Sequence, residues 1–333
     1  MSEPDSNAPA IEAVSLCKRY GAFTAVSDIS FAVARGEIVG FLGPNGAGKS
    51  TTMRILSGLM PATSGTARLC GVSVPAEPDL AKRHLGYMPE NNPLTEELRV
   101  VEYLVWRAKL KGVPSGRIRE RVDAVMDACD LTRTARRKLI GTLSKGFRQR
   151  VGIADALLAE PEAVILDEPT IGLDPHQILG IRDLIRSLRG KVAVLISSHI
   201  LAEIEQVCDR VIIINGGRIV AQGTTASLRR EFFPGRVFSV VCAAAPADIA
   251  RLLGTVEPAV VVSETAAPDA DGMRSLRVEM PEAAPLARHL LATLAATPST
   301  GLREVAEEHP SLEDIFIAAT RRSRDIVSAE IGV

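Results

Sequence analysis

The chain has 333 residues, which suggests about two domains on the usual size range. Its 39 Lys and Arg against 40 Asp and Glu give a net charge of −1, with the charges spread along the sequence. This balance and the 4% of aromatic residues argue against a basic, base-stacking surface, so no nucleic-acid partner is expected.

The N-terminus carries no secretory signal, and the cysteines fit a reducing compartment. Residues 1–10 are polar and acidic, which predicts a disordered N-terminus rather than a secretory signal. No apolar run approaches the roughly 18–20 residues that span a bilayer. Separate reduced thiols are favoured over a disulfide framework or a metal site, which fits the cytoplasm, because the cysteines lie far apart with no C-x-x-C pair. They are Cys17, Cys70, Cys129, Cys208 and Cys242.

A phosphate-binding loop follows the first buried strand. The apolar run Ile38–Leu42 predicts that strand, and a helix is expected from Thr52 onward. Between them the chain fits the pattern G-x-x-x-x-G-K-[ST] at every fixed position. The matching stretch is Gly43, Pro44, Asn45, Gly46, Ala47, Gly48, Lys49, Ser50 and Thr51.

The residue types in this loop explain its chemistry. Backbone N–H groups and the start of the following helix point at a phosphate, and glycine lets the backbone approach without a Cβ clash. Lys49 is expected to neutralise the β- and γ-phosphates, and the Ser50 hydroxyl to hold Mg²⁺. The loop therefore predicts that the chain binds a nucleoside triphosphate.

The rest of the first 223 residues reads as a three-layer α/β domain. Nearly continuous apolar runs at 163–166, 192–196 and 211–214 predict central strands covered on both faces. Between about residues 90 and 160 helical periodicity replaces the strand signal, which predicts an inserted helical subdomain. Residues 11–232 are assigned to this nucleotide-binding domain.

The texture changes past Phe233-Pro234-Gly235, so residues 233–333 are assigned to a small α+β accessory domain. Strands are expected at 237–241 and 275–280, a helix at 285–296, and a surface loop at 265–272. Ser311 followed by Asp314 resembles a capping box that opens a last helix. The residues expected to face a core from that helix are Leu312, Ile315, Phe316 and Ala319.

Two acidic residues end the strand at 163–166. Asp167 can hold Mg²⁺ through water, because hard cations prefer carboxylate oxygen. Glu168 beside it can polarise the attacking water as a general base. Acidic pairs at strand ends are common surface features, so this pair carries weight mainly together with the phosphate loop.

Further motifs follow in a fixed order, and with them the chain resembles the ATP-binding subunits of ABC transporters. The resemblance runs from Tyr20 to about Gly223. Its motifs, besides the phosphate loop and the two acids, are Tyr20, the loop at Glu90, the signature from Leu143 to Phe147, Gly172-Leu173-Asp174 and Ser198-His199. This similarity implies the α/β P-loop NTPase fold of an ABC ATPase.

The resemblance also implies a shared site in a head-to-tail dimer of two copies. Ser144 and the Gly146 backbone would bind the γ-phosphate held by the partner's phosphate loop. His199 would contact the γ-phosphate, Asp174 would link the two sites, and Tyr20 would stack on adenine. An ordinary loop histidine and a packed surface aromatic are the plain alternatives for His199 and Tyr20.

Two positions depart from the family pattern. The signature has Lys145 where glycine is usual, and this side chain either adds a cation near the phosphates or points to solvent. Glu90 replaces the glutamine of the following loop; it can still ligate Mg²⁺, or it is an exposed loop acid. Both departures resemble ATPases that work with a separate ABC-2-type permease, including drug-resistance and gliding-motility ATPases.

The function expected from this resemblance is an ATPase that drives an exporter. The chain would lie in the cytoplasm on the inner face of the membrane, docked to a separate permease through the helical subdomain and the loop from Glu90 to Leu98. The alternatives are a soluble ABC ATPase without a transport role and a module that binds nucleotide without hydrolysis. The sequence does not specify the cargo.

Overall fold

The structure is a computed structural model and describes residues 8–198, 200–281 and 290–331. The chain forms two compact units, Met1–Thr225 with Ala319–Val333, and Ala226–Ala318. The end of the last helix, α11 (Leu312–Ile331), thus groups with the first unit, although the sequence placed all of 233–333 in one domain. Within the first unit, Asn215 Nδ2 donates to the Thr320 carbonyl oxygen at 3.4 Å.

A six-stranded sheet forms the centre of the first unit. Its spatial order is β10-β9-β3-β8-β7-β6, and every pair is parallel except β9 with β10. The central strands β3, β7 and β8 are buried at every position, which explains their continuous apolar runs. The strands are β3 (Ile38–Leu42), β6 (Leu85–Met88), β7 (Ala163–Asp167), β8 (Ala193–Ser197), β9 (Arg210–Asn215) and β10 (Arg218–Gly223).

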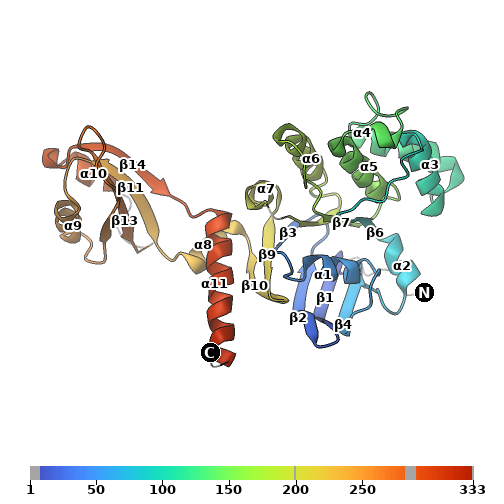
Figure 1. The fold of residues 1–333 in the computed structure, drawn as a ribbon, viewed down its shortest axis with the longest axis horizontal. Coiled ribbons are helices and arrows are strands. Elements are labelled where there is room, and N and C mark those ends of the chain that lie inside the picture. Colours follow the sequence, from blue (N-terminus) through green and yellow to red (C-terminus); the bar gives the residue numbers. More distant parts are fainter. Residues whose placement is uncertain (1–7, 199, 282–289, 332–333) are drawn as a thin grey trace. The chain divides into compact units, whose positions relative to one another are not determined.

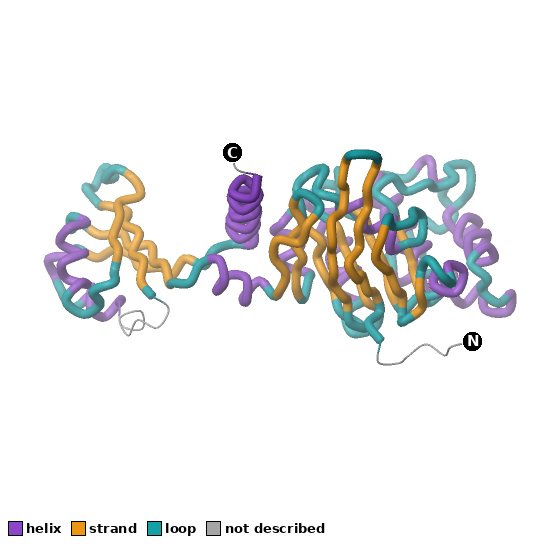
Figure 2. Tube along the Cα trace, turned by 90° about the horizontal axis from the view of Figure 1, so that it is seen from below, coloured by secondary structure: helices purple, strands orange, loops and turns teal. Residues whose placement is uncertain are grey.

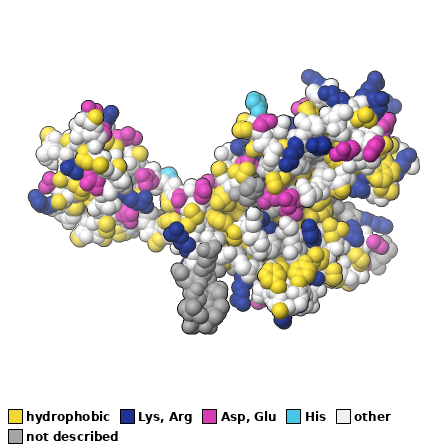
Figure 3. Space-filling view, in the orientation of Figure 1, with side chains coloured by type: hydrophobic (Ala, Val, Ile, Leu, Met, Phe, Trp, Pro, Cys, Tyr) yellow, Lys and Arg dark blue, Asp and Glu magenta, His cyan; other side chains and the backbone are white. Residues whose placement is uncertain are grey.

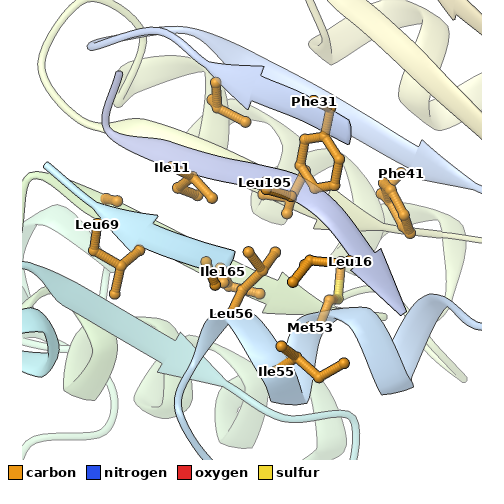
Figure 4. Close-up of a cluster of buried hydrophobic side chains, with 14 of the residues drawn as sticks. Ile11, Leu16, Phe31, Phe41, Met53, Ile55, Leu56, Leu69, Ile165 and Leu195 are labelled. Carbon is orange, nitrogen blue, oxygen red and sulfur yellow. The ribbon is translucent and has the colours of Figure 1, made fainter. Parts of the chain in front are cut away.

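A second, antiparallel sheet packs over the first helix, and Figure 2 shows its long strands side by side. Its order is β2-β1-β4-β5, with β1 (Ile11–Tyr20), β2 (Phe23–Val33), β4 (Ser64–Leu69) and β5 (Val72–Ser73). Helix α1 (Lys49–Leu56) contacts strands of both sheets. Figure 4 shows the result: Met53 and Leu56 of α1 share one buried cluster with Leu16 and Phe31 of the antiparallel sheet and Ile165 of the parallel sheet.

The helical subdomain consists of α3 (Val100–Leu110), α4 (Ile118–Ala128) and α5 (Lys145–Leu157). Acidic and basic side chains are interspersed over it in Figure 3. Beneath them, the nearly buried Asp155 carboxylate of α5 accepts two 2.9 Å hydrogen bonds from Arg107 and lies 3.3 Å from Lys111 Nζ. Because a bidentate guanidinium satisfies both carboxylate oxygens, this contact fixes α3 against α5.

The remaining helices of the first unit cover or flank the sheets. They are α2 (Pro78–Arg83), α6 (Pro175–Ser187) and α7 (Leu201–Val207), with short 3₁₀ turns at Ser115–Arg117 and Ile140–Thr142. Across the described part of the chain, no helix combines the length and the apolar character needed to cross a membrane.

The second unit has its own sheet and core. The antiparallel order is β12-β13-β11-β14, and α9 and α10 supply apolar side chains to one cluster with β11 and β13. Figure 1 shows this sheet with α9 and α10 beside it. Its elements are α8 (Thr225–Phe232), β11 (Arg236–Cys242), α9 (Pro246–Gly254), β12 (Val261–Ala266), β13 (Arg274–Met280), α10 (Leu290–Ala295), β14 (Leu302–Glu308) and a 3₁₀ turn at Pro298–Thr300.

The fold class is confirmed, with specific corrections. Ala10, predicted to end a disordered segment, is fully buried, and its N–H donates to the Val33 carbonyl oxygen at 2.9 Å. The helix expected at 285–296 is described only from Leu290, because residues 282–289 lie outside the described part. The capping box is confirmed: Asp314 N–H donates to Ser311 Oγ at 3.2 Å and Ser311 N–H to Asp314 Oδ2 at 2.8 Å.

Candidate nucleotide-binding site

The phosphate loop joins the end of β3 to the start of α1. Gly46 and Gly48 have φ values of 78° and 104°, a conformation that side chains with a Cβ rarely adopt. Space is also limiting, since a Cβ on Gly48 would lie 2.5 Å from the Ala25 carbonyl oxygen of β2. The glycines of the motif are therefore needed both for the shape of the loop and for its packing.

Lys49 is the first residue of α1 and is largely buried. Its Nζ donates to the carbonyl oxygens of Gly43 at 2.7 Å and Pro44 at 3.3 Å. Burial lowers the pKa of Lys49, while the carboxylates of Glu168, Asp167 and Glu90 raise it. The ammonium group thus lies inside the loop and close to three carboxylates. These carboxylates favour its charged form.

The two acids at the end of β7 share one serine. Ser197 Oγ, at the end of β8, donates to Asp167 Oδ1 at 2.6 Å and accepts a 2.8 Å hydrogen bond from the Glu168 backbone N–H. Burial raises the pKa of Asp167, an effect opposed by hydrogen bonds from Ser197 and Ser50 and reinforced by the Glu168 carboxylate. Glu168 itself adopts a positive φ of 51°, so the chain turns sharply after the strand.

A cavity of about 540 Å³ lies over the phosphate loop. It brings together sequence-predicted residues from four parts of the chain: Tyr20, the loop residues Pro44 to Thr51, Glu90 and Glu168. Phe23, Ala25 and Ile171 complete its lining. The volume fits a small-molecule ligand, and the loop provides the phosphate-binding end.

Two aromatic residues form the apolar end of the cavity. Tyr20 and Phe23 face each other across the tight turn between β1 and β2, and 46% and 63% of their surfaces are exposed. Tyr20 Oη donates to Met60 Sδ at 2.9 Å, which holds the ring in place. Exposed rings of this kind can stack on a base.

Glu90 lines the cavity from the loop that follows β6. Beyond it, Asn92 Nδ2 lies where a Cβ on Gly152 of α5 would stand, and it donates to the Arg148 carbonyl oxygen at 3.4 Å. Glu96 pairs with Arg148 Nη1 at 3.5 Å. The loop is thus anchored on the helix that begins with the signature motif.

Ser144, Gly146 and Asp174 do not line this cavity. Ser144 is the exposed N-cap of α5, and Asp174 is the N-cap of α6, where Oδ1 accepts from Gln177 N–H at 2.9 Å. The Gln177 side chain packs on Gly146, where a Cβ would lie 2.8 Å from it. The three residues therefore group at two neighbouring helix starts, away from the phosphate loop of the same chain.

The structure describes Lys145 but not His199. Lys145 Nζ lies at the place that a Cβ on Gly172 would occupy, so its side chain turns to the loop before α6. His199 falls outside the described residues, and its predicted contact with the γ-phosphate stays a prediction.

Sequence reasoning missed Ser197, Phe23 and Ile171. Phe23 carried a usable signal, because a second aromatic residue three positions after Tyr20 marks the far side of a short turn. Ser197 carried none, since its role depends on the alignment of Asp167 with Ser197 in adjacent parallel strands.

Similarity to known proteins agrees with this geometry. The model of the family described as "ABC transporter" matches residues 26–171, from within β2 to three residues past Glu168. The daunorubicin/doxorubicin resistance ATP-binding protein DrrA of Streptomyces peucetius is 35% identical over 325 residues, which cover 96% of this chain and 95% of that protein. The Nod factor export ATP-binding protein I of Rhizobium etli is 31% identical over 319 residues, 95% of each chain.

The fold gives the same result. A solved structure described as the ATP-binding subunit of an ABC transporter aligns with a TM-score of 0.61 and 35% identity, covering 67% of this chain and 93% of that one. Similarity of this extent, combined with a phosphate loop and acidic strand end at one cavity, establishes ATP binding and hydrolysis as the shared chemistry. The chain belongs to the ATP-binding subunits of ABC transporters.

Proposed function

We propose that this subunit powers an ABC-2-type exporter whose permease is a separate chain, and that it works as a head-to-tail dimer with Mg²⁺ and ATP. The dimer is supported by the separation of the phosphate loop from the signature residues within one chain. The cavity holds the phosphate loop, while Ser144 and Gly146 lie at another place on the same unit. A second copy can bring its α5 N-terminus, with the backbone N–H groups of the first turn and a positive dipole end, to the γ-phosphate.

Three oxygen-bearing side chains support the proposal of Mg²⁺. Ser50 and Glu90 line the cavity, and the Ser50 hydroxyl favours the ionised form of the nearby, buried Asp167. Hydroxyl and carboxylate oxygens suit a small hard cation. When bound, Mg²⁺ would supply positive charge that offsets the negative charge of the phosphates. Ser50 and Asp167 would hold it, and Glu90 would approach it from the loop after β6.

The remaining roles follow from position. Lys49 would exchange its loop carbonyl partners for the β- and γ-phosphates. Glu168, turned into the cavity by its positive φ, would accept a proton from the attacking water, with His199 at the γ-phosphate. Tyr20 and Phe23 would stack on adenine. ATP binding would stabilise the dimer, and ATP hydrolysis would let the two copies separate. The ATP cycle would thereby do mechanical work on the permease.

Export is supported by the relatives. One is named for daunorubicin/doxorubicin resistance and another for Nod factor export, and both match along nearly their whole length. The permease would dock at the helical subdomain and the loop from Glu90 to Leu98, which would place the subunit on the inner face of the membrane. The cargo would be selected by the permease.

The test uses Glu168→Gln, which keeps the shape of the side chain but removes its charge and its ability to act as a base. With Mg²⁺ and ATP this variant should run as a dimer in size-exclusion chromatography, and adding Ser144→Arg should leave it monomeric. Ser115→Arg, an exposed serine in the same subdomain, is the matched control and should still dimerise. A Ser144→Arg protein that dimerises normally would overturn the shared site. A membrane partner with about six spanning helices, co-purified with the chain, is the expected permease; co-purification with ribosomes instead would contradict transport.

A further inference from the structure

Three donor side chains outside the nucleotide site converge in the first unit. Cys70 Sγ, His84 Nδ1 and a Glu162 carboxylate oxygen all lie within 4.8 Å of one another. Among the described residues, His, Cys, Asp and Glu form no other group of three this close. The nucleotide chemistry described above uses none of them.

The fold explains why these residues meet. His84 and Glu162 directly precede β6 and β7, and the pairing of Leu85 with Ala163 sets them side by side. The Ala163 N–H donates to the His84 carbonyl oxygen at 3.0 Å, which fixes the two segments. Cys70 comes from the other sheet, at the end of β4, with a positive φ of 51°. Helix α2 contacts both β4 and β6, and Figure 1 shows it beside them.

The three ligand residues differ in burial. Cys70 is fully buried, and its N–H donates to the Ala10 carbonyl oxygen at 3.0 Å. His84 Nδ1 lies 3.1 Å from Glu162 Oε2; their side chains are 13% and 39% exposed. A ligand can therefore reach the sulfur past the partly exposed Glu162.

We propose that Cys70, His84 and Glu162 bind one Zn²⁺ ion, with water in the fourth position. Thiolate, imidazole and carboxylate are the three donor types that Zn²⁺ takes in proteins, whereas Mg²⁺ and Ca²⁺ avoid sulfur. Tetrahedral Zn²⁺ at its usual bond lengths places ligand atoms roughly 3.3–3.8 Å apart. The pair His84–Glu162 is already near that separation, and rotation of side chains closes the rest.

The binding equilibrium balances through one proton. The Cys70 thiol gives its proton to solvent as sulfur bonds to Zn²⁺, and the His84 ring donates a lone pair from Nδ1. The Arg35 guanidinium is a positive charge near the Cys70 sulfur, and it disfavours a bound cation there. Because Arg35 is exposed, it can move out to solvent when Zn²⁺ enters.

The ion would cross-link the two sheets. Cys70 directly follows β4 of the antiparallel sheet, whereas His84 and Glu162 directly precede strands of the parallel sheet. Binding to the folded state alone raises its stability by RT ln(1 + [Zn²⁺]/Kd), so zinc should raise the melting temperature of the first unit. The wide spacing of the cysteines in the sequence favours separate thiols over a metal site. At Cys70, however, the fold brings His84 and Glu162 close, and their distance in the sequence gives no sign of this.

Cobalt(II) tests the site directly, because zinc is spectroscopically silent. The full-length chain, reduced, without nucleotide and in excess Mg²⁺, should bind one Co²⁺ with a thiolate-to-cobalt charge-transfer band and tetrahedral d–d bands, both bleached by Zn²⁺. Cys70→Ser should remove the charge-transfer band. His84→Gln and Glu162→Gln should weaken binding by more than about 10-fold, since even outer-shell partners are worth about 10–100-fold. Cys17→Ser, in the same sheet, is the matched control and should bind like the wild type.

Arg35→Gln provides an independent variant at an exposed position, and it should tighten Co²⁺ and Zn²⁺ binding by removing a competing cation. A wild-type chain without the charge-transfer band, or equal Zn²⁺ affinity in Cys70→Ser and wild type, would refute the site. Octahedral d–d bands alone would place Co²⁺ on oxygen ligands and would also refute it. None of these outcomes depends on ATP hydrolysis, dimerisation or the permease.

Discussion

Ser197 joins the two acidic residues at the end of β7, and it does so with one hydroxyl. The proton of that hydroxyl goes to Asp167 and its lone pair receives the Glu168 backbone N–H. All three residues are buried. Ser197 is therefore a positioning residue, which orients the carboxylate expected to hold Mg²⁺ and the turn that aims Glu168 at the cavity.

Replacement of Ser197 by alanine should remove one hydrogen bond from the Asp167 carboxylate and one from the Glu168 backbone N–H. We expect a loss of about 1–3 kcal/mol in the free energy of unfolding, because buried hydrogen bonds, especially those to charged groups, contribute about this much. The ATPase rate should fall and the Mg²⁺ requirement rise. Urea unfolding and steady-state hydrolysis at varied Mg²⁺ provide the measurements.

The neighbouring serine serves as the control for this prediction. Ser198 is equally buried, but its Oγ accepts only the Ile200 N–H, at 3.0 Å, among the hydrogen bonds recorded for the described residues. Ser198→Ala should leave the Mg²⁺ dependence unchanged. The same Mg²⁺ dependence in Ser197→Ala and wild type would contradict the positioning role.

At this scale the sequence predicts what is contiguous and misses what is assembled. The phosphate loop can be predicted because nine consecutive residues form one structure. Glu168 can be predicted because it directly follows Asp167 in the sequence. Ser197 stands 30 residues from Asp167, and only the strand alignment of β7 with β8 brings it there.

Among the elements, the loop after β6 packs closely on helix α5 because α5 has a glycine, Gly152, at the contact. Asn92 occupies the space that Gly152 leaves open, and Glu96 pairs with Arg148 on the same helix. Movement of this loop must therefore move α5, whose first turn carries the signature residues. The proposed permease contact and the proposed partner contact thus share one helix.

Gly152→Ala should push the Asn92 side chain off α5. Because the obstacle is a flexible side chain, we expect a small stability loss, within about 1 kcal/mol, but faster amide hydrogen exchange at residues 90–98. Adding Asn92→Gly should recover stability while exchange stays fast. Gly116→Ala is the control, since a Cβ there meets nothing within 4 Å. Unchanged exchange at 90–98 in Gly152→Ala would show that the loop is held by other contacts.

Strands β11 and β14 of the second unit are joined by an ion pair with a pH signature. Arg236 Nε and Nη2 donate to the Glu307 carboxylate at 2.7 and 2.6 Å. The guanidinium lowers the pKa of Glu307, an effect slightly opposed by burial. Since the folded pKa lies below the unfolded one, the stabilisation is present above the ordinary glutamate pKa of about 4.3 and is lost as the pH falls through the folded pKa.

Glu307→Gln should remove this part of the acid sensitivity. Above about pH 5 the variant should unfold at lower urea concentration than the wild type, and the difference should shrink as the pH falls below about 4. Circular dichroism during urea titration at several pH values measures it. Glu304→Gln, an exposed position on the same strand, should show no such convergence.

For the elements, the sequence was most accurate where strands are buried on both faces. The apolar runs of β3, β7, β8 and β9 all became strands of the parallel sheet. It missed β14, whose residues Leu302–Glu308 are mostly charged and exposed, because an edge strand needs little burial and shows no clear alternation. The strand forms because β11 offers it hydrogen-bond partners along its whole length.

The whole chain divides into a nucleotide-binding unit and a smaller unit with a separate core. That core joins β11 and β13 with α9 and α10, and Val240 and Val278 at its centre are fully buried. A composition change near residue 233 announced the second unit, and contacts place its beginning at Ala226. The grouping of residues 319–333 with the first unit depends on long-range packing, which local pattern does not reveal.

A fragment of residues 226–318 should fold by itself, because it contains a complete sheet and its own apolar cluster. We expect a mixed α/β circular dichroism spectrum and a cooperative urea transition. Val240→Asp should abolish the transition, whereas Val261→Asp, at a side 59% exposed, should keep it. A gradual, non-cooperative melt of the unaltered fragment would show that the second unit needs the rest of the chain.

The hydrogen bonds of Lys49 to the carbonyl oxygens of Gly43 and Pro44 have a kinetic consequence. A loop with an ordered lysine inside needs no search through conformations when a nucleotide arrives, so little entropy is lost on binding. Arrival should then be limited by diffusion, and departure by how readily the lysine returns to its own backbone. The Gly43 and Pro44 carbonyl oxygens would thus take the place of the phosphates as partners of Lys49. Lys49 would therefore affect how long a nucleotide stays bound rather than how fast it is captured.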